Sequence, residues 1–155
     1  YNHPTKDCTC GTEVVQRYLN KISGPLLDRI DLHVEVLPVH FDEMRGTTSH
    51  EGSKEIYRRV IAARAMQTRR FAEQTFQVNA LMDSPTTRKI CQLDQASEIR
   101  LKTAMQRLSL SARAYDRILK VARTIADLDQ SEQIQLEHLT EAIAYRSLDR
   151  ENWGG

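Results

Sequence analysis

The spacing of apolar residues changes once along this chain, and the change divides it into two parts. From residue 30 to residue 36 apolar and polar side chains alternate strictly, with Ile30, Leu32, Val34 and Val36 on one face, which predicts a half-buried β-strand. From residue 53 onward apolar residues recur at helical spacing instead. Because a single strand cannot satisfy its own backbone groups, we expect the sheet of this strand to lie in sequence outside the chain.

The second part predicts a compact helical bundle over residues 53–150, large enough to bury its own core. Ser53 is predicted to cap a helix to about Phe71, and Ser84-Pro85 marks a second start. Asp94 and Ser111 are predicted to cap a third and a fourth helix, because their side chains accept hydrogen bonds from free first-turn N–H groups. The fourth helix carries an apolar stripe, and a fifth helix follows a polar loop. The stripe consists of Ala114, Ile118, Val121, Ile125 and Leu128, and the fifth helix holds Leu139, Ala142 and Ile143.

The first part predicts little regular structure. Residues 1–11 read as a polar loop, Thr12 begins a short helix that ends before Ser23-Gly24-Pro25, and residues 37–52 read as a linker. In the isolated chain we expect residues 1–40 to be poorly ordered or only locally helical, because the predicted strand has no neighbour.

Composition bounds the possible settings of the chain. Its 155 residues include 22 basic and 21 acidic side chains, so the net charge of +1 predicts no partner. No apolar run is long enough to span a membrane. The start has neither Met nor an apolar leader, which predicts a cut through a longer protein. Three cysteines without a secretion signal favour a reducing cytoplasm.

Two segments resemble a known family. Residues 22–32, ISGPLLDRIDL, resemble the segment before the last core strand of magnesium-chelatase-like AAA+ ATPases, and minichromosome maintenance helicases have a similar arrangement. Residues 110–119, LSARAYDRIL, continued by 121–126, resemble the sensor-2 helix in the α-helical lid domain of the same family. Residues 142–150 resemble the last helix of that family. The resemblance covers most of residues 8–150. It is strongest to the bacterial competence-type branch, hexameric motors linked to branch migration of DNA.

The resemblance implies a domain organisation and a function. Residues 1–49 would be the end of the α/β AAA+ core with one orphan strand, and residues 50–155 the α-helical lid, so that the chain is mainly α. Arg29 matches the arginine finger, which acts in trans on a neighbour's γ-phosphate, and Arg113 matches the sensor-2 arginine. The full-length protein would use ATP and Mg²⁺ in a cytoplasmic ring. Its partners would be the chain's own N-terminal AAA+ core, neighbouring subunits and DNA, with no membrane.

Both arginines also have simpler interpretations. Phosphoryl transfer depends on positioned charge, so a cation from a neighbouring subunit can account for a large part of the rate enhancement. Arg29, however, lies between Asp28 and Asp31 and could form a surface ion pair. Arg113 lies in a first turn, where the helix dipole disfavours a cation by about 0.3–1 kcal/mol, and Asp116 could offset that cost. A phosphate approaching this turn would instead meet the guanidinium and free N–H groups.

The sequence lacks the parts that bind the nucleotide itself. It contains no G-x-x-x-x-G-K-[ST] phosphate loop and no apolar strand that ends in an acidic pair for Mg²⁺. In the family that the chain resembles, both elements precede the segments seen here. We therefore expect this chain alone to bind no cofactor and not to hydrolyse ATP.

Two weaker patterns suggest a metal site and a nucleic-acid surface. The resemblance implies a further cysteine pair upstream, with which Cys8 and Cys10 would complete a zinc site in the full-length protein, but the sequence favours unpaired loop cysteines. Cys91, in an apolar helical context, predicts a buried small residue. Residues 54–70 contain six basic side chains and form either a solvated helix face or a phosphate-contacting one. The candidate DNA contacts are Arg58, Arg59, Arg69 and Arg70.

Two other functions remain open at this point. The lid sequences of metal-chelatase motors, which insert Mg²⁺ into a porphyrin, resemble those of the DNA motors. A stand-alone helical interaction domain without a nucleotide role is the third possibility, and the orphan strand argues against it.

Overall fold

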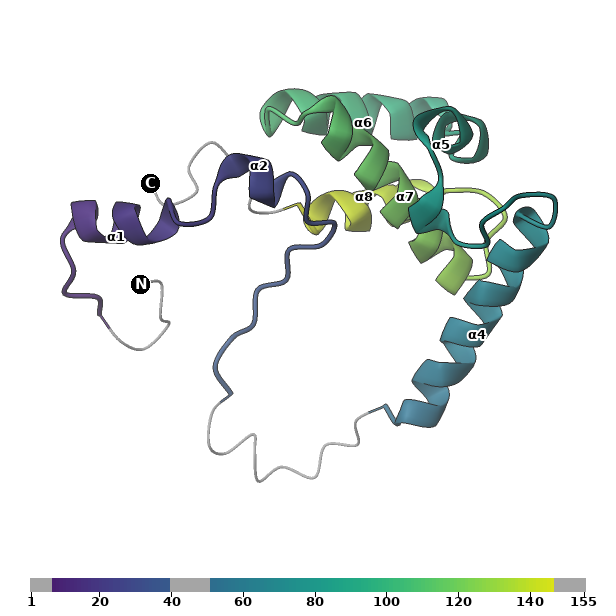
Figure 1. Cartoon of the computed structure of the whole chain (residues 1–155), viewed down its shortest axis with the longest axis horizontal. Coiled ribbons are helices and arrows are strands. Elements are labelled where there is room, and N and C mark those ends of the chain that lie inside the picture. Colours follow the sequence, from purple (N-terminus) through teal and green to yellow (C-terminus); the bar gives the residue numbers. More distant parts are fainter. Residues whose placement is uncertain (1–6, 40–50, 147–155) are drawn as a thin grey trace.

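The computed structural model describes residues 7–39 and 51–146, and the regular structure within these ranges is helical (Figure 1). The mainly α prediction is therefore confirmed for them. The elements are α1 (Thr12–Leu19), α2 (Gly24–Leu27), α4 (Ser53–Arg70), the 3₁₀ helix η1 (Asn79–Leu81), α5 (Ser84–Ile90), α6 (Gln95–Arg107), α7 (Ala112–Leu128) and α8 (Leu136–Ala144). The predicted boundary between residues 49 and 50, and the end of the predicted closing helix, lie outside the described ranges.

Residues 30–36 do not form the β-strand that their alternation predicts. They run as irregular chain in which Val34 and Val36 are exposed. The described ranges contain no neighbouring strand for them, and His33 N–H instead donates to the Tyr145 carbonyl at 2.8 Å. Alternation records which side chains would share a face, but a strand forms only when its backbone groups find a partner. Before residue 40 the described structure is, as expected, only locally helical, in α1 and α2.

The predicted caps form at two bundle helices but not at α4, which begins at Ser53 with Gly52 as its N-cap and no side-chain cap. The side chain of Asp94 accepts from Ser97 N–H at 2.8 Å, and Ser111 Oγ accepts from Ala114 N–H at 3.1 Å. Helix α5 begins at Ser84, as predicted, and its cap is Asp83, whose side chain accepts from Thr86 N–H at 2.9 Å. Hydrogen bonds from the side chain and N–H of Thr86 lower the pKa of Asp83, and hydrogen bonds from the N–H and side chain of Ser97 lower the pKa of Asp94, because they favour the ionised carboxylates.

Helix α7 is the centre of the bundle, since α8, α4, α5 and η1 all pack against it, while α6 packs on α8 (Figure 1). Its buried face is rotated from the predicted stripe. Leu119, Ala122 and Ala126 are almost fully buried, whereas Leu128 is 42% exposed. The neighbouring helices pack against the alanines because small side chains allow a close approach. The predicted stripe is therefore only partly correct: Ala114 and Ile118 are buried, but Leu128 is not.

A buried charge network, which the sequence analysis did not identify, ties α4 and η1 to α7. Asp127 lies 2.5 Å from Arg70 and 3.1 Å from Arg123, and Asn79 Nδ2 donates to it at 2.8 Å. Arg123 also donates to the carbonyl groups of residues 131 and 132, at 2.5 and 2.7 Å. Burial lowers the pKa of Arg123, and the nearby Asp127 carboxylate opposes this effect. The network fixes the carboxyl end of α4 on the bundle.

The described helices include none with the length and apolar character needed to cross a bilayer.

Candidate functional site

Arg29 lies on the turn after α2 with an exposed side chain. Its guanidinium donates one long hydrogen bond, 3.4 Å, to the Pro25 carbonyl within the same turn. In the described ranges no carboxylate lies within ion-pair distance of it, although it is flanked by Asp28 and Asp31. The surface ion pair that the sequence left open for Arg29 is therefore not formed among the described residues.

The Asp28 side chain contacts helix α7 and not Arg29. Its carboxylate accepts a hydrogen bond from Ser111 Oγ at 2.8 Å and lies 3.7 Å from Nη1 of Arg113. A third cation, Nη2 of Arg146, is 3.9 Å away. Asp28 thus connects the turn that carries Arg29 with the first turn of α7.

The residues after Arg29 are attached to the helical bundle as well. Asp31 pairs with Arg117 of α7, and the carbonyl of Ile30 accepts from Arg146, just after α8. His33 is 7% exposed and is held through its backbone by Tyr145. The segment from residue 27 to residue 33 is therefore docked on α7 and on the end of α8.

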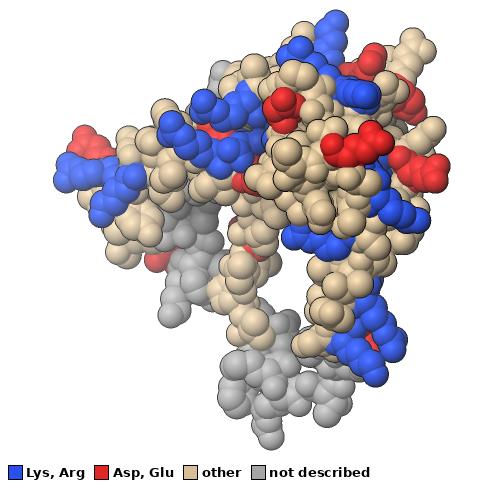
Figure 2. Space-filling view, turned by 45° about the vertical axis from the view of Figure 1, so that its right-hand side comes forward, with Lys and Arg blue, Asp and Glu red and all other residues tan. Residues whose placement is uncertain are grey.

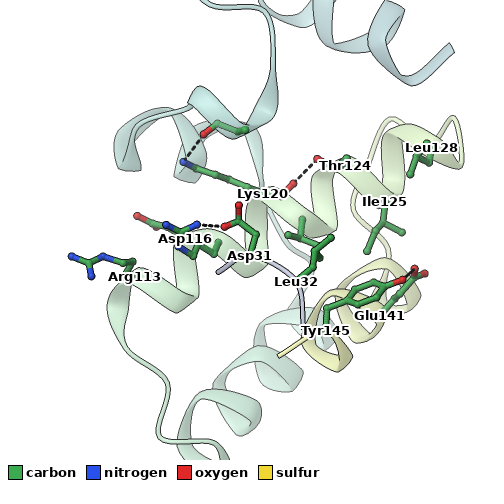
Figure 3. A pocket seen from close by; sticks show the side chains of 13 residues that line it. Asp31, Leu32, Arg113, Asp116, Lys120, Thr124, Ile125, Leu128, Glu141 and Tyr145 are labelled. Atoms are coloured by element: carbon green, nitrogen blue, oxygen red, sulfur yellow. Dashed lines mark hydrogen bonds and ion pairs between the residues drawn. The ribbon is translucent and has the colours of Figure 1, made fainter. Parts of the chain in front are cut away.

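Arg113 occupies the second position of α7, and its side chain is 55% exposed. The local pairing with Asp116 is wrong for the described structure, because Asp116 accepts from Ser84 Oγ and Arg113 pairs with Asp28. Figure 3 shows the Arg113 guanidinium directed away from the neighbouring pocket. Since Asp28 directly precedes Arg29 and contacts Arg113, the fold brings the two candidate arginines into one region.

A pocket of about 520 Å³ lies beside this region, between residues 31–32, α7 and α8 (Figure 3). Its walls are largely apolar, from Leu32, Val121 and Ile125. Its three cations, Arg113, Arg117 and Lys120, are matched by the carboxylates of Asp31, Asp116 and Glu141. Because these charges balance, the pocket is not by itself an anion-binding site.

The cysteines do not form a metal centre in the described part of the chain. Cys8 and Cys10 are exposed and free, and no group of three or more metal-binding side chains gathers there. Cys10 hydrogen-bonds to Cys8 and lowers the pKa of its thiol, while the interaction raises the pKa of Cys10. Two sulfurs do not supply the four ligands that structural zinc needs, so a zinc site in the full-length protein stays a prediction.

Cys91 behaves as the sequence predicted, as a small buried residue of the core. It is 3% exposed, and burial raises the pKa of its thiol to about 12.

The basic residues of α4 separate into two groups. Arg58, Arg59 and Arg69 are exposed, and Arg59 pairs with Glu51 at 2.6 Å. Figure 2 shows Lys and Arg side chains gathered at the free end of α4. Arg70 is different, because its guanidinium is bound to Asp127 within the bundle. Its assignment as a DNA contact is corrected to a packing role, while the other three stay predictions.

Sequence reasoning missed three residues of this region: Asp31, Arg117 and Arg146. Arg117 follows Arg113 by one helical turn, a spacing that places both side chains on one face. That spacing could have singled it out, but no local pattern links it to Asp31, 86 positions away.

Comparison with known proteins gives two family matches. The family described as magnesium chelatase, subunit ChlI C-terminal matches residues 50–146, and the family described as magnesium chelatase, subunit ChlI matches residues 1–44. The first match alone covers more than half of the chain.

Individual relatives agree with these matches. The YifB protein of Escherichia coli is 44% identical over 142 residues, 91% of this chain and 27% of the relative. The competence protein ComM of Haemophilus influenzae is 39% identical over 137 residues, 88% of this chain and 26% of the relative. The Mycobacterium tuberculosis protein Rv2897c is 33% identical over 141 residues, 91% of this chain and 28% of the relative. The chain thus spans about a quarter of the length of these curated relatives.

Proposed function

Since this chain belongs to the magnesium chelatase subunit ChlI family, we propose that it is the lid region of an ATP-driven ring, to which it supplies an arginine finger, Arg29, and a nucleotide sensor, Arg113. The upstream part of the full-length protein would be the AAA+ core that holds ATP and Mg²⁺. In the described ranges, Asp28 and Asp31 are already bound to arginines. This part of the chain therefore contributes cations to the site and no free acidic pair for a metal.

One observation carries the proposal for Arg29: it is the exposed cation between two aspartates that both bind elsewhere. A guanidinium without a carboxylate partner keeps its charge available for a phosphate of a neighbouring subunit. In related phosphoryl-transfer enzymes such an arginine contributes about 10³–10⁵-fold to kcat, because it stabilises charge that develops in the transition state.

The geometry around Arg113 supports a sensing role. Its contact with Asp28, at 3.7 Å and with a side chain 55% exposed, is long for an ion pair and contributes little in water. A phosphate at the amino end of α7 would compete well, because it would also meet the free N–H groups of the first turn. Binding would then release Arg113 from Asp28 and shift the lid.

The ring is proposed to act on DNA in the cytoplasm, as a hexamer. The name of the H. influenzae relative, a competence protein, supports the DNA branch of the family. The exposed Arg58, Arg59 and Arg69 are the candidate phosphate contacts of this chain.

The test is Arg29→Ala in the full-length ring. We expect kcat for ATP hydrolysis to fall at least about 10³-fold, while the Kd of a fluorescent ATP analogue stays nearly unchanged. Arg100→Ala, an exposed arginine on α6, is the matched control and should behave as wild type. Near-normal turnover in Arg29→Ala would remove the finger assignment.

A motor subunit of a metal chelatase is the second candidate, favoured by the description of the matching family. The two candidates differ in what raises the ATPase rate. A DNA motor should respond to branched or single-stranded DNA, and a chelatase motor should respond to its partner subunits.

A further inference from the structure

The residues on both sides of Arg29 are bound to the helical bundle, whereas its own guanidinium makes a long hydrogen bond, 3.4 Å, to the Pro25 carbonyl. Contacts to the lid are made on both sides of it, through the side chain of Asp28, the carbonyl of Ile30, the side chain of Asp31 and the backbone N–H of His33. The position of the backbone at Arg29 is therefore set by groups that belong to α7 and to the end of α8.

The contacts differ in whether they can persist during nucleotide binding. In the proposed function Arg113 leaves Asp28 when it engages a phosphate, so that part of the attachment is released. Arg117 lies one turn further along the same face of α7, and its side chain is 26% exposed, compared with 55% for Arg113. Arg117 forms an ion pair with Asp31, and both residues line the pocket. The pair of Asp31 and Arg117 is thus placed to keep the Arg29 segment attached while Arg113 moves.

This pair is poorly suited to a purely stabilising role. The Asp31 side chain is 56% exposed, and partly exposed ion pairs contribute little to folding. Within the described residues, Nε of Arg117 is buried and has no hydrogen-bond acceptor.

We propose that Asp31 and Arg117 are positioning residues that join the Arg29 segment to helix α7, so that a movement of the lid is transmitted to the arginine finger. The inference rests on the proposed function of Arg29 and Arg113. It adds two residues that touch neither nucleotide nor metal and act through Arg29.

Charge reversal and charge exchange in the full-length ring test the proposal. Asp31→Arg and Arg117→Asp should each lower kcat for ATP at least about tenfold, because small displacements of a positioned group cost large factors in rate. The KM and the Kd for ATP should change less than about twofold, since ATP is bound elsewhere. The double variant with both changes restores opposite charges and should recover most of kcat.

Milder and matched variants guard against loss of folding. Asp31→Asn and Arg117→Gln remove the ion pair with little change in shape and should lower kcat in the same direction. Arg100→Asp, on the exposed face of α6, changes the net charge as Arg117→Asp does and should leave kcat and the melting temperature unchanged.

The outcomes separate this inference from the proposed function. If Arg29→Ala is inactive but the reversals at Asp31 and Arg117 turn over normally, the positioning role is wrong and the finger stands. If the reversals lower kcat together with the melting temperature and the exchange rescues neither, the pair is structural and the inference also fails. If Arg29→Ala retains normal turnover, the proposed function itself is removed.

Discussion

At the residue scale, the described structure separates arginines that pair inside the helical bundle from arginines whose charge is exposed to solvent and could bind a ligand. Arg70 and Arg123 share the buried Asp127 carboxylate, whereas Arg29 and Arg113 are exposed beside the first turn of α7. The difference is one of solvation. A buried guanidinium must be paired because its desolvation is costly. An exposed guanidinium stays hydrated without a partner, so its charge remains available to bind a phosphate.

The buried network predicts a large effect at Asp127. Asp127→Asn leaves Arg70 and Arg123 without a counter-charge, and removal of one partner from a buried pair costs about 3–5 kcal/mol. Urea unfolding followed by circular dichroism would measure this loss of unfolding free energy. Glu73→Gln, on an exposed turn, is the control and should stay within about 0.5 kcal/mol of wild type. A loss for Asp127→Asn no larger than the control's would show the network to be dispensable.

The cysteines predict a second residue-scale result. Cys8 and Cys10 are exposed, and Cys91 is buried with a pKa raised to about 12. Because the thiolate is the reactive form, a disulfide reagent at about pH 8 should titrate Cys8 and Cys10 in the native chain and Cys91 only after unfolding. In Cys91→Ala the native and unfolded counts should be equal. Rapid reaction of all the thiols in the native wild type would contradict the buried position of Cys91.

At the element scale, helix starts are where sequence and structure agree best. A cap is satisfied within one turn, so Asp94 and Ser111 need no distant residue to act. The buried face of α7 is different, because it depends on which helices pack against it. Val121 and Ile125, in the predicted stripe, line the pocket, while Ala122 and Ala126 are in the core.

The cap of α6 predicts a pH dependence. The folded-state pKa of Asp94 is lowered by hydrogen bonds from Ser97, so its stabilising contribution is present above the unfolded pKa, about 3.9, and is lost as pH falls through the folded value. Asn caps helices without titrating in this range. Between about pH 5 and about pH 3, Asp94→Asn should lose less stability than wild type. Urea midpoints at both pH values measure this, and equal losses would exclude the cap as the cause.

At the scale of the whole molecule, the helical bundle buries most of the apolar side chains, and the segment before it buries few. The apolar core lies between Phe71 and Ile143. The described segment before residue 40 adds the buried Val15, Leu19, Leu27 and His33 and a few polar contacts. The bundle thus has the core of an independent folding unit, and the segment is fastened to its surface (Figure 1).

This inequality predicts the result of a truncation. A chain of residues 51–155 should keep its helix content and unfold cooperatively, with a melting temperature lower by about 4–8 °C for each kcal/mol of lost docking contacts. Thermal unfolding followed by circular dichroism measures both quantities. A broad transition without a defined midpoint would mean that the segment is needed for the fold. Neither form should hydrolyse ATP, because both lack a phosphate loop.

The sequence by itself determined the features that a few neighbouring residues decide. These are the helical class, the caps at Asp94 and Ser111, and the buried character of Cys91; the local motifs also identified the family and, through it, Arg29 and Arg113 as candidates. Only the tertiary structure decided that residues 30–36 form no strand in the described chain, that Arg70 belongs to a buried network, and that Asp31 meets Arg117. The pairs of Arg70 and Asp31 depend on residues far along the chain, and the strand depends on a neighbouring strand that the described ranges do not contain. The local spacing of residues carries no information about either.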